Sequence, residues 1–157
     1  MAVLISEVVQ GEPLGKQRPI HSPGRRRPRT PDRTVSWETS ASAQFRAAWG
    51  RDGEPYLGAV ILQVAAVKSR PKKYDPGKYG ADRIWRLDVP DGDNVLKIVA
   101  DSLKKAEVFR DDRQIVAWYC LDLYAAVEEG PCVEVLLAQA PARPRGAHLV
   151  IPSRVGG

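Results

Sequence analysis

A nearly continuous apolar run at residues 57–68, LGAVILQVAAVK, constrains the fold of this chain more than any other stretch. Its middle is rich in β-branched side chains, and a run of this kind suits a strand that is covered on both faces. It falls short of the ~18 consecutive apolar residues that a membrane-spanning helix requires. We therefore expect a central strand with a sheet built around it, and no membrane as a partner.

The spacing of apolar residues elsewhere predicts the rest of the fold. In chain order we expect a strand at 3–9, a helix at 35–49, the central strand at 57–68, a helix at 94–106, and two antiparallel strands at 115–126 and 132–139 joined by a turn at 128–131. The order β-α-β-α-β-β predicts an α+β fold, in which two helices cover one face of a mixed β-sheet. A chain of 157 residues fits a single domain of this kind.

Three segments do not fit into a sheet. Residues 12–34 hold five prolines and seven basic side chains, and residues 69–84 form a second basic stretch with interleaved tyrosines. Neither can build a core, so we expect two long loops within a domain that spans residues 1–139. The last segment, residues 140–157, is rich in Pro, Arg and Gly and is expected to be a tail.

The net charge of +5 is distributed unevenly. Residues 1–34 carry +4 and residues 68–86 carry +5, whereas residues 87–139 carry −6. Basic segments attract a polyanion by releasing its counterions, and an acidic cluster repels the same polyanion unless a metal ion neutralises it. The distribution favours a nucleic acid and a metal ion used together; the alternative is solvated loops beside an acidic helix face.

The two basic loops supply the candidate DNA-binding side chains. In the first loop these are Lys16, Arg18, Arg25, Arg26, Arg27 and Arg29, and in the second Arg70, Lys72, Lys73 and Lys78. A guanidinium binds a phosphate through two parallel hydrogen bonds, and aromatic rings among cations suit stacking on unpaired bases. The alternatives are a first loop that only keeps the protein in solution and tyrosines that only pin the second loop to the domain.

The two cysteines, Cys120 and Cys132, do not predict a disulfide. On the two strands of the expected hairpin they would lie roughly 23 Å apart, which is too far for a bridge. With two histidines in the chain there is also no zinc pattern. The first ten residues lack the basic and apolar regions of a signal peptide, so we expect an intracellular protein.

The most acidic stretch follows the second basic loop and holds the candidate metal site. Asp91 and Asp93 stand at the start of the predicted helix, and Asp112 stands near the start of the next strand. If the helix packs on the sheet, these two points can meet at one edge, and three carboxylates with waters suit Mg²⁺ or Mn²⁺. The alternative is structural: aspartates that cap a helix or form a turn, and Lys97 paired with Asp101 on a solvated face.

Other well-known sites do not fit this stretch. An EF-hand that started at Asp91 would need Gly at its sixth position and Glu at its twelfth, where the chain has Leu96 and Ser102. No Gly-rich loop ends in Lys-Ser or Lys-Thr, which excludes a P-loop. No Ser or Cys has a His partner in a catalytic pattern.

One family signature does match. Residues 91–103, DGDNVLKIVADSL, followed by residues 111–115, DDRQI, resemble the aspartate motif of the RusA family of Holliday junction resolvases. Residues 13–19, PLGKQRP, resemble the basic entry motif of that family. Residues 30–38, TPDRTVSWE, resemble the lead into its first helix.

The resemblance implies a RusA-like fold and a homodimeric, Mg²⁺-dependent endonuclease, with Mn²⁺ as a substitute ion. Such an enzyme nicks two opposing strands of a four-way DNA junction in recombination and repair. Residue by residue, Asp91, Asp93 and Asp112 match the metal-binding aspartates of the family. Lys97 matches its catalytic lysine, which would stabilise negative charge in the transition state.

Three further residues are expected to support that site. Asn94 would tie down the aspartate loop. Asp101 would orient Lys97 or hold the fold together internally rather than bind the metal, because it lies two turns inside the helix. Asp111 would face away from Asp112 if the strand has begun there. The chain departs from the family at residues 115–127, which contain no Lys where the family often has one.

Two other functions stay open on the sequence. A non-catalytic protein that binds branched DNA would use the same basic loops, but it would have no use for three aspartates and a lysine in this arrangement. A metal-dependent nuclease for other branched or single-stranded DNA would need the same site. The motifs do not distinguish a cellular role from that of a resident phage.

Overall fold

The computed structural model describes residues 2–50 and 52–142, and it contains every element that the sequence predicts. The elements are β1 (Val3–Gln10), α1 (Asp32–Trp49), β2 (Val60–Lys68), α2 (Pro76–Tyr79), β3 (Ile84–Trp85), α3 (Gly92–Lys105), the 3-10 turn η1 (Asp112–Gln114), β4 (Ile115–Tyr124) and β5 (Cys132–Gln139). The short elements α2 and β3 were not predicted; they lie in and beside the second basic loop. The predicted tail lies outside the described residues from position 143 onward.

The five strands form one mixed sheet in the order β1-β5-β2-β4-β3. β2 pairs in parallel with β4 and antiparallel with β5. β1 pairs antiparallel with β5, and the short β3 pairs antiparallel with the last residues of β4. The apolar run thus lies in the centre of the sheet as predicted, and the α+β class is confirmed.

The predicted hairpin between β4 and β5 is wrong, because β2 lies between these strands and pairs with both. β2 has the most buried sequence of the five strands, so the central place removes most apolar surface from water. The connection from β4 to β5 passes the end of β2, where Ala125 donates its backbone N–H to the carbonyl of Lys68. Cys120 and Cys132 are both free thiols, as predicted.

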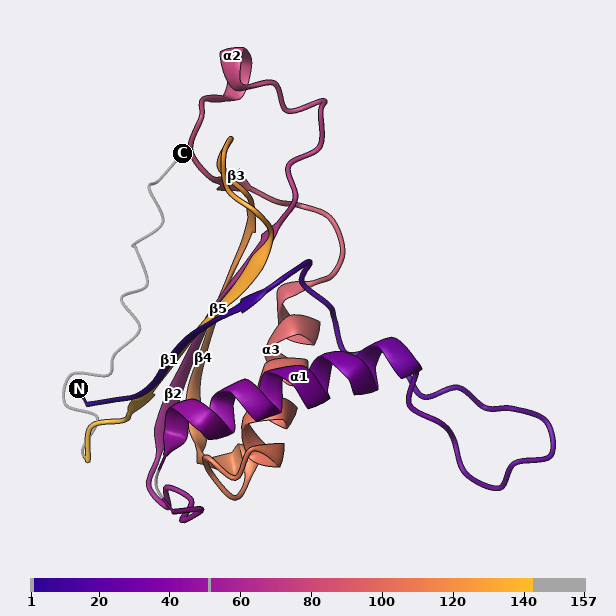
Figure 1. The fold of residues 1–157 in the computed structure, drawn as a ribbon, viewed down its shortest axis with the longest axis vertical. Helices are drawn as coiled ribbons and strands as arrows, with labels where there is room; N and C mark the ends of the chain where they lie inside the picture. The colour runs from indigo at the N-terminus through magenta and orange to yellow at the C-terminus, as the bar shows by residue number, and fades with distance from the viewer. Residues whose placement is uncertain (1, 51, 143–157) are drawn as a thin grey trace, which may run out of the picture.

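The two long helices cover one face of the sheet (Figure 1). Their apolar side chains recur at helical spacing and therefore point to the same side. α3 buries Ile98, Val99 and Leu103 completely, and α1 buries Phe45 completely. These side chains pack with the inner face of the sheet into one core, which fixes both ends of α3 relative to the strands.

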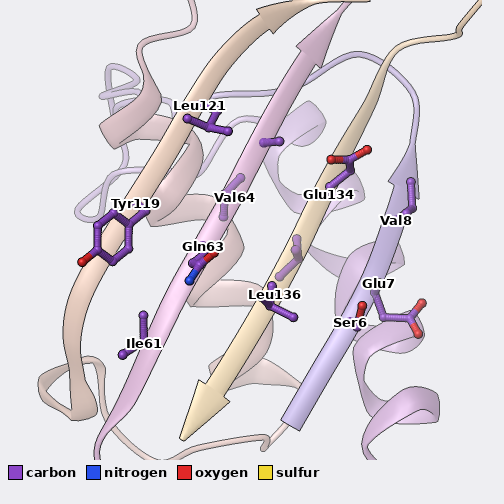
Figure 2. Close-up of a pocket in the computed structure, with 12 residues that line it drawn as sticks. Ser6, Glu7, Val8, Ile61, Gln63, Val64, Tyr119, Leu121, Glu134 and Leu136 are labelled. Carbon is purple, nitrogen blue, oxygen red and sulfur yellow. The ribbon is translucent and has the colours of Figure 1, made fainter. Parts of the chain in front are cut away.

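The other face of the sheet is covered by no described helix. Figure 2 shows a hollow on it, lined by side chains of β1, β5, β2 and β4. Tyr119 and Leu121 of β4 are 58% and 49% exposed on this face. Among the described residues, no helix is both long enough and apolar enough to cross a membrane.

Candidate active site

α3 presents two of the predicted metal ligands at its N-terminus. Asp91 is the N-cap residue, and its carbonyl accepts a 3.0 Å hydrogen bond from the backbone N–H of Asn94. Asp93 follows in the first turn, where its carboxylate accepts a 3.0 Å hydrogen bond from Lys97. This hydrogen bond lowers the pKa of Asp93. Both carboxylates are exposed at the positive end of the helix dipole, where anionic groups are favoured.

Behind these aspartates lies a buried ion pair that the sequence did not predict. The side chain of Arg86 is fully buried, and its Nη2 atom is 2.6 Å from Oδ1 of Asp122, near the end of β4. Asp122 also lies against Gly92, the residue between the two aspartates, whose backbone N–H favours the charged form of its carboxylate. Burial raises the pKa of Asp122. The one signal in the sequence was a charged residue within an otherwise apolar strand.

Asp112 lies at the opposite end of α3. Its Oδ1 atom is 3.1 Å from Nζ of Lys104, which follows Asp93 by three helical turns, about 16 Å along the axis. The chain turns back after α3, so β4 starts at that far end and reaches Gly92 only near its own end, at Asp122. A single chain therefore does not bring Asp112 to the other two aspartates, and the predicted meeting at one edge of the sheet is wrong.

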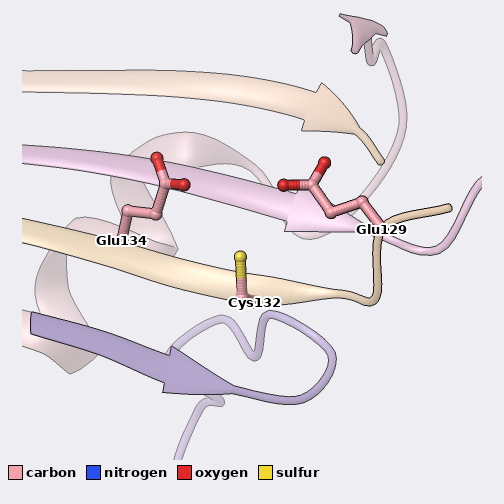
Figure 3. A group of neighbouring side chains, drawn as sticks. All are labelled: Glu129, Cys132 and Glu134. Atoms are coloured by element: carbon pink, nitrogen blue, oxygen red, sulfur yellow. The ribbon is translucent and has the colours of Figure 1, made fainter. Parts of the chain in front are cut away.

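One group of potential metal ligands does converge in the described part of the chain, but it lies elsewhere. Glu129, Cys132 and Glu134 each bring one ligand atom to within 4.8 Å of the others (Figure 3). The guanidinium of Arg83 lies 2.5 Å from Glu134 and also bonds to Glu129. Because an arginine already neutralises both carboxylates, the group is an internal ion-pair network.

A family model described as endodeoxyribonuclease RusA matches residues 10–137, well over half of the chain. The chain belongs to the RusA family. Membership makes it an endodeoxyribonuclease, a hydrolase whose partner is DNA. The match spans both basic loops, the N-terminus of α3 and η1. No curated protein matches the chain.

In this RusA domain, Asp111 and Asn94 support the backbone. The carboxylate of Asp111 accepts the N–H of Arg113 at 2.9 Å, and the side chain of Gln114 accepts the N–H of Asp111 at 3.0 Å. The Arg113 guanidinium lowers the pKa of Asp111 to about 2. The carbonyl of Asn94 accepts a 3.0 Å bond from the N–H of Lys16, which ties the entry segment to the start of α3.

Lys16, a candidate for DNA contact, and Asp101, expected to support the site, pair with each other. Nζ of Lys16 is 2.7 Å from Asp101 on α3 and also bonds to Glu38 on α1. Burial works against the ammonium charge, but the bonds to both carboxylates raise the pKa of Lys16. Lys16 thus joins the entry segment to both helices, and the carboxylate beside Lys97 is that of Asp93.

Residues 17–31 project from the RusA domain as an arm that leads into α1 (Figure 1). Backbone hydrogen bonds of 2.7 and 2.9 Å between Ile20 and Arg29 close the arm into a hairpin-like loop. The exposed arginines of the arm are Arg18, Arg25, Arg26, Arg27 and Arg29. Arg29 pairs with Asp32 at 3.3 Å. The arm therefore presents a cluster of cations to solvent, as the sequence predicted.

The second basic loop divides into a structural part and an exposed part. Arg70 donates to three backbone carbonyls, including that of Ala125 at 3.0 Å, so it holds the loop to the sheet. The ring of Tyr74 lies 5.0 Å from the ring of Tyr124 on β4. Tyr74 thus attaches the loop to the domain, which was the alternative to base stacking in the sequence analysis. The exposed cations of the loop are Lys72, Lys73 and Lys78.

Proposed function

We propose that this RusA-family chain is a divalent-metal-dependent endonuclease that resolves four-way DNA junctions as a homodimer, in recombination and repair. The observation that carries the proposal is the pair of exposed carboxylates at the N-terminus of α3, with Lys97 beside them. A polyanionic substrate would be repelled by such a pair unless a cation lay between them. Family membership supports DNA as that substrate.

The residues fit Mg²⁺, with Mn²⁺ as a substitute, because both ions prefer carboxylate oxygens. Asp91 and Asp93 would hold the ion from one side. Asp112 is the third candidate: its Oδ1 atom is buried and accepts no hydrogen bond within the described structure, although Lys104 lies 3.1 Å away. A bound Mg²⁺ would neutralise the phosphate and lower the pKa of its water.

Asp112 would reach this ion from a second copy of the chain. Within residues 2–50 and 52–142, the edge of β4 is free over most of its length, because β3 pairs only with Leu123 and Tyr124. Two copies that pair along this edge about a two-fold axis would run antiparallel. The η1 turn of the second copy would then lie at the end of β4 where the first copy holds Asp91 and Asp93.

The side chains along this edge support an interface. Large apolar side chains are exposed here and on the segment before α3: Trp85, Leu87, Val89, Val116, Trp118, Tyr119 and Leu121. A strand edge with unpaired backbone groups and exposed apolar side chains is a surface that proteins usually cover. A second copy would cover it, and the dimer would hold two centres for cuts in two opposing strands.

The roles proposed for Lys97 and for the two basic loops follow from their charge and their position. The ammonium of Lys97 lies 3.0 Å from Asp93, where it would stabilise the charge that develops on the phosphorane or on the leaving oxygen. The arginines of the arm and the exposed lysines of the second loop would bind phosphates of the junction arms. These contacts position the DNA without reading its sequence.

The test is to incubate the purified protein with a labelled four-way junction, a duplex and a single strand, each with and without Mg²⁺. Paired nicks in the junction alone, and only with Mg²⁺, are the expected result. Salt-sensitive binding with no nicking would instead indicate a non-catalytic binding protein. Cleavage that shows no preference for the junction would indicate a nuclease for other branched or single-stranded DNA.

A further inference from the structure

We propose that Arg86 and Asp122 are positioning residues for the metal-binding aspartates. They lie behind residues 88–92 and fix this loop, so that Asp91 and Asp93 are held in place before an ion or DNA arrives. The inference rests on the proposed function, and it adds two residues whose role is to hold the ligands rather than to touch the ion or the phosphate.

Arg86 connects the loop to the sheet through four hydrogen-bond acceptors. Its Nη1 atom donates to the carbonyl of Pro90 at 2.9 Å, to the carbonyl of Asp88, and to the carboxylate of Asp88 at 3.2 Å. Its Nη2 atom donates to Asp122 at 2.6 Å. A guanidinium can donate to several fixed acceptors at once. Arg86 therefore fixes the position of the backbone that leads into α3 relative to β4.

Asp122 contacts the aspartate motif directly. A Cβ atom at Gly92 would lie 2.8 Å from Oδ2 of Asp122 and 3.1 Å from Sγ of Cys120. The chain thus approaches β4 at Gly92 as closely as a residue without a side chain allows. Because Asp91 and Asp93 flank Gly92, any shift at this contact moves both metal-ligand candidates.

Asp88 completes the attachment of the loop. Its Oδ2 atom accepts a 2.7 Å hydrogen bond from the hydroxyl of Tyr124 and lies 3.3 Å from Nζ of Lys68. Lys68 also donates to the carbonyl of Val89 at 3.0 Å. The loop is therefore held from β2 and β4 as well as by Arg86.

The buried charge itself indicates a role beyond stability. The free energy needed to remove two charges from water offsets most of their mutual attraction. An apolar pair of similar volume would therefore stabilise the fold by at least as much. The Nε atom of Arg86 is buried without a hydrogen-bond partner within the described structure, which adds to this cost. What an apolar pair would not supply is the set of directed bonds that orients the loop.

The experiment compares the wild type with Arg86→Lys, which keeps the charge but loses the fork. Binding of Mn²⁺ to the protein is followed by electron paramagnetic resonance, and junction cleavage is followed as a function of Mg²⁺. Residues that orient metal ligands change metal affinity or activity by about 10- to 100-fold. We expect that loss in both measurements, with junction affinity within about threefold because Arg86 is buried away from phosphate.

Arg83→Lys is the matched control, because Arg83 bonds to two carboxylates in a similar way but at the other ion-pair network. Gly92→Ala is a second, uncharged variant that pushes the same loop through its new Cβ atom. Weaker Mn²⁺ binding in Arg86→Lys and Gly92→Ala, but not in Arg83→Lys, would support the inference.

Wild-type Mn²⁺ affinity in both loop variants, or an equal loss in Arg83→Lys, would overturn it. Should Arg86→Lys fail to fold, the comparison of Gly92→Ala with Arg83→Lys decides alone. A wild type that neither binds Mn²⁺ nor cleaves would overturn the proposed function as well, so the two failures are distinguishable.

Discussion

Asp112 lies 3.1 Å from Lys104, at the end of α3 that is farthest from Asp93. The helix between them is packed on the sheet, with Ile98 and Leu103 completely buried. No rotation of side chains closes a gap of about 16 Å. If both aspartates hold one ion, they therefore come from two chains, and dimerisation becomes a condition for chemistry rather than an addition to it.

Mixing two inactive variants is expected to restore cleavage. Asp93→Asn and Asp112→Asn should each abolish cleavage, because every site of either homodimer lacks one ligand. In a heterodimer of the two, one composite site carries both substitutions and the other carries neither. After exchange at equal concentrations, about half of the dimers are mixed and about a quarter of all sites are intact. Nicking of one strand of a labelled junction measures this recovery.

The control for this experiment is a mixture of Asp91→Asn and Asp93→Asn. These residues lie at the same end of one helix, so both sites of their heterodimer stay defective whichever arrangement holds. If each site lay within one chain, the first mixture would stay as inactive as the control. That outcome would remove Asp112 from the shared site.

Asp93→Asn alone is expected to separate binding from chemistry. The substitution removes a proposed metal ligand, so cleavage should fall to background. It also removes a negative charge from the proposed phosphate site. An exposed charge at about 4 Å contributes about 1 kcal/mol in water, so junction affinity should stay equal or rise by up to about fivefold. Fluorescence anisotropy without metal measures it. Asp52→Asn, near the far end of α3, serves as the control and should leave both properties unchanged.

The elements of the fold were predictable because each depends on local periodicity. The buried stripe of α3 and the apolar run of β2 both follow from the spacing of side chains along a few turns or residues. The pairing of strands was not predictable in this way, because it depends on which strand takes the most buried place in the sheet. β4 and β5 are neighbours in sequence, but β2 buries more apolar surface and lies between them.

The candidate site was predictable only where its residues share one short segment. Asp91, Asp93 and Lys97 lie within two turns of α3, so their proximity follows from the helix itself. The place of Asp112 depends on the direction in which the chain leaves α3, which no local pattern encodes. Arg86 was missed for a related reason: its burial is set by Asp122, which lies far from it in the sequence.

The arginine arm is expected to bind phosphates without regard to sequence. Replacing Arg25, Arg26 and Arg27 by Gln should weaken binding to junction and duplex by similar factors. Each lost phosphate contact lowers the slope of log affinity against log salt by about 0.9. Binding titrations at several salt concentrations measure the slope. The unfolding free energy should not change, because these side chains are exposed.

Arg46→Gln is the control for the arm. Arg46 is also exposed, but it pairs with Glu107 near the C-terminal ends of α1 and α3, away from the arm. Its replacement should leave the salt slope as it is in the wild type. An unchanged slope in the arm variant would show that the arginines make no phosphate contacts.

The Arg83 network is expected to stabilise the fold in a pH-dependent way. The Arg83 guanidinium lowers the pKa of Glu129 in the folded state, so the network stabilises the protein above the ordinary pKa of Glu and loses this contribution as the pH falls. Glu129→Gln should reduce the unfolding free energy by about 1–2 kcal/mol at pH 7. The difference from the wild type should shrink below pH 4. Urea unfolding at the two pH values measures it, with the neighbouring Glu128→Gln as control.

The same variant also tests where the metal ion binds. Glu129, Cys132 and Glu134 form the group of ligand atoms that converges within the described chain, yet Arg83 already bonds to both carboxylates. An ion would have to displace a guanidinium from both glutamates to bind there. Glu129→Gln should therefore leave the Mg²⁺ dependence of cleavage unchanged, whereas Asp93→Asn should abolish cleavage. A shift in that dependence would move the metal site from the N-terminus of α3 to this network.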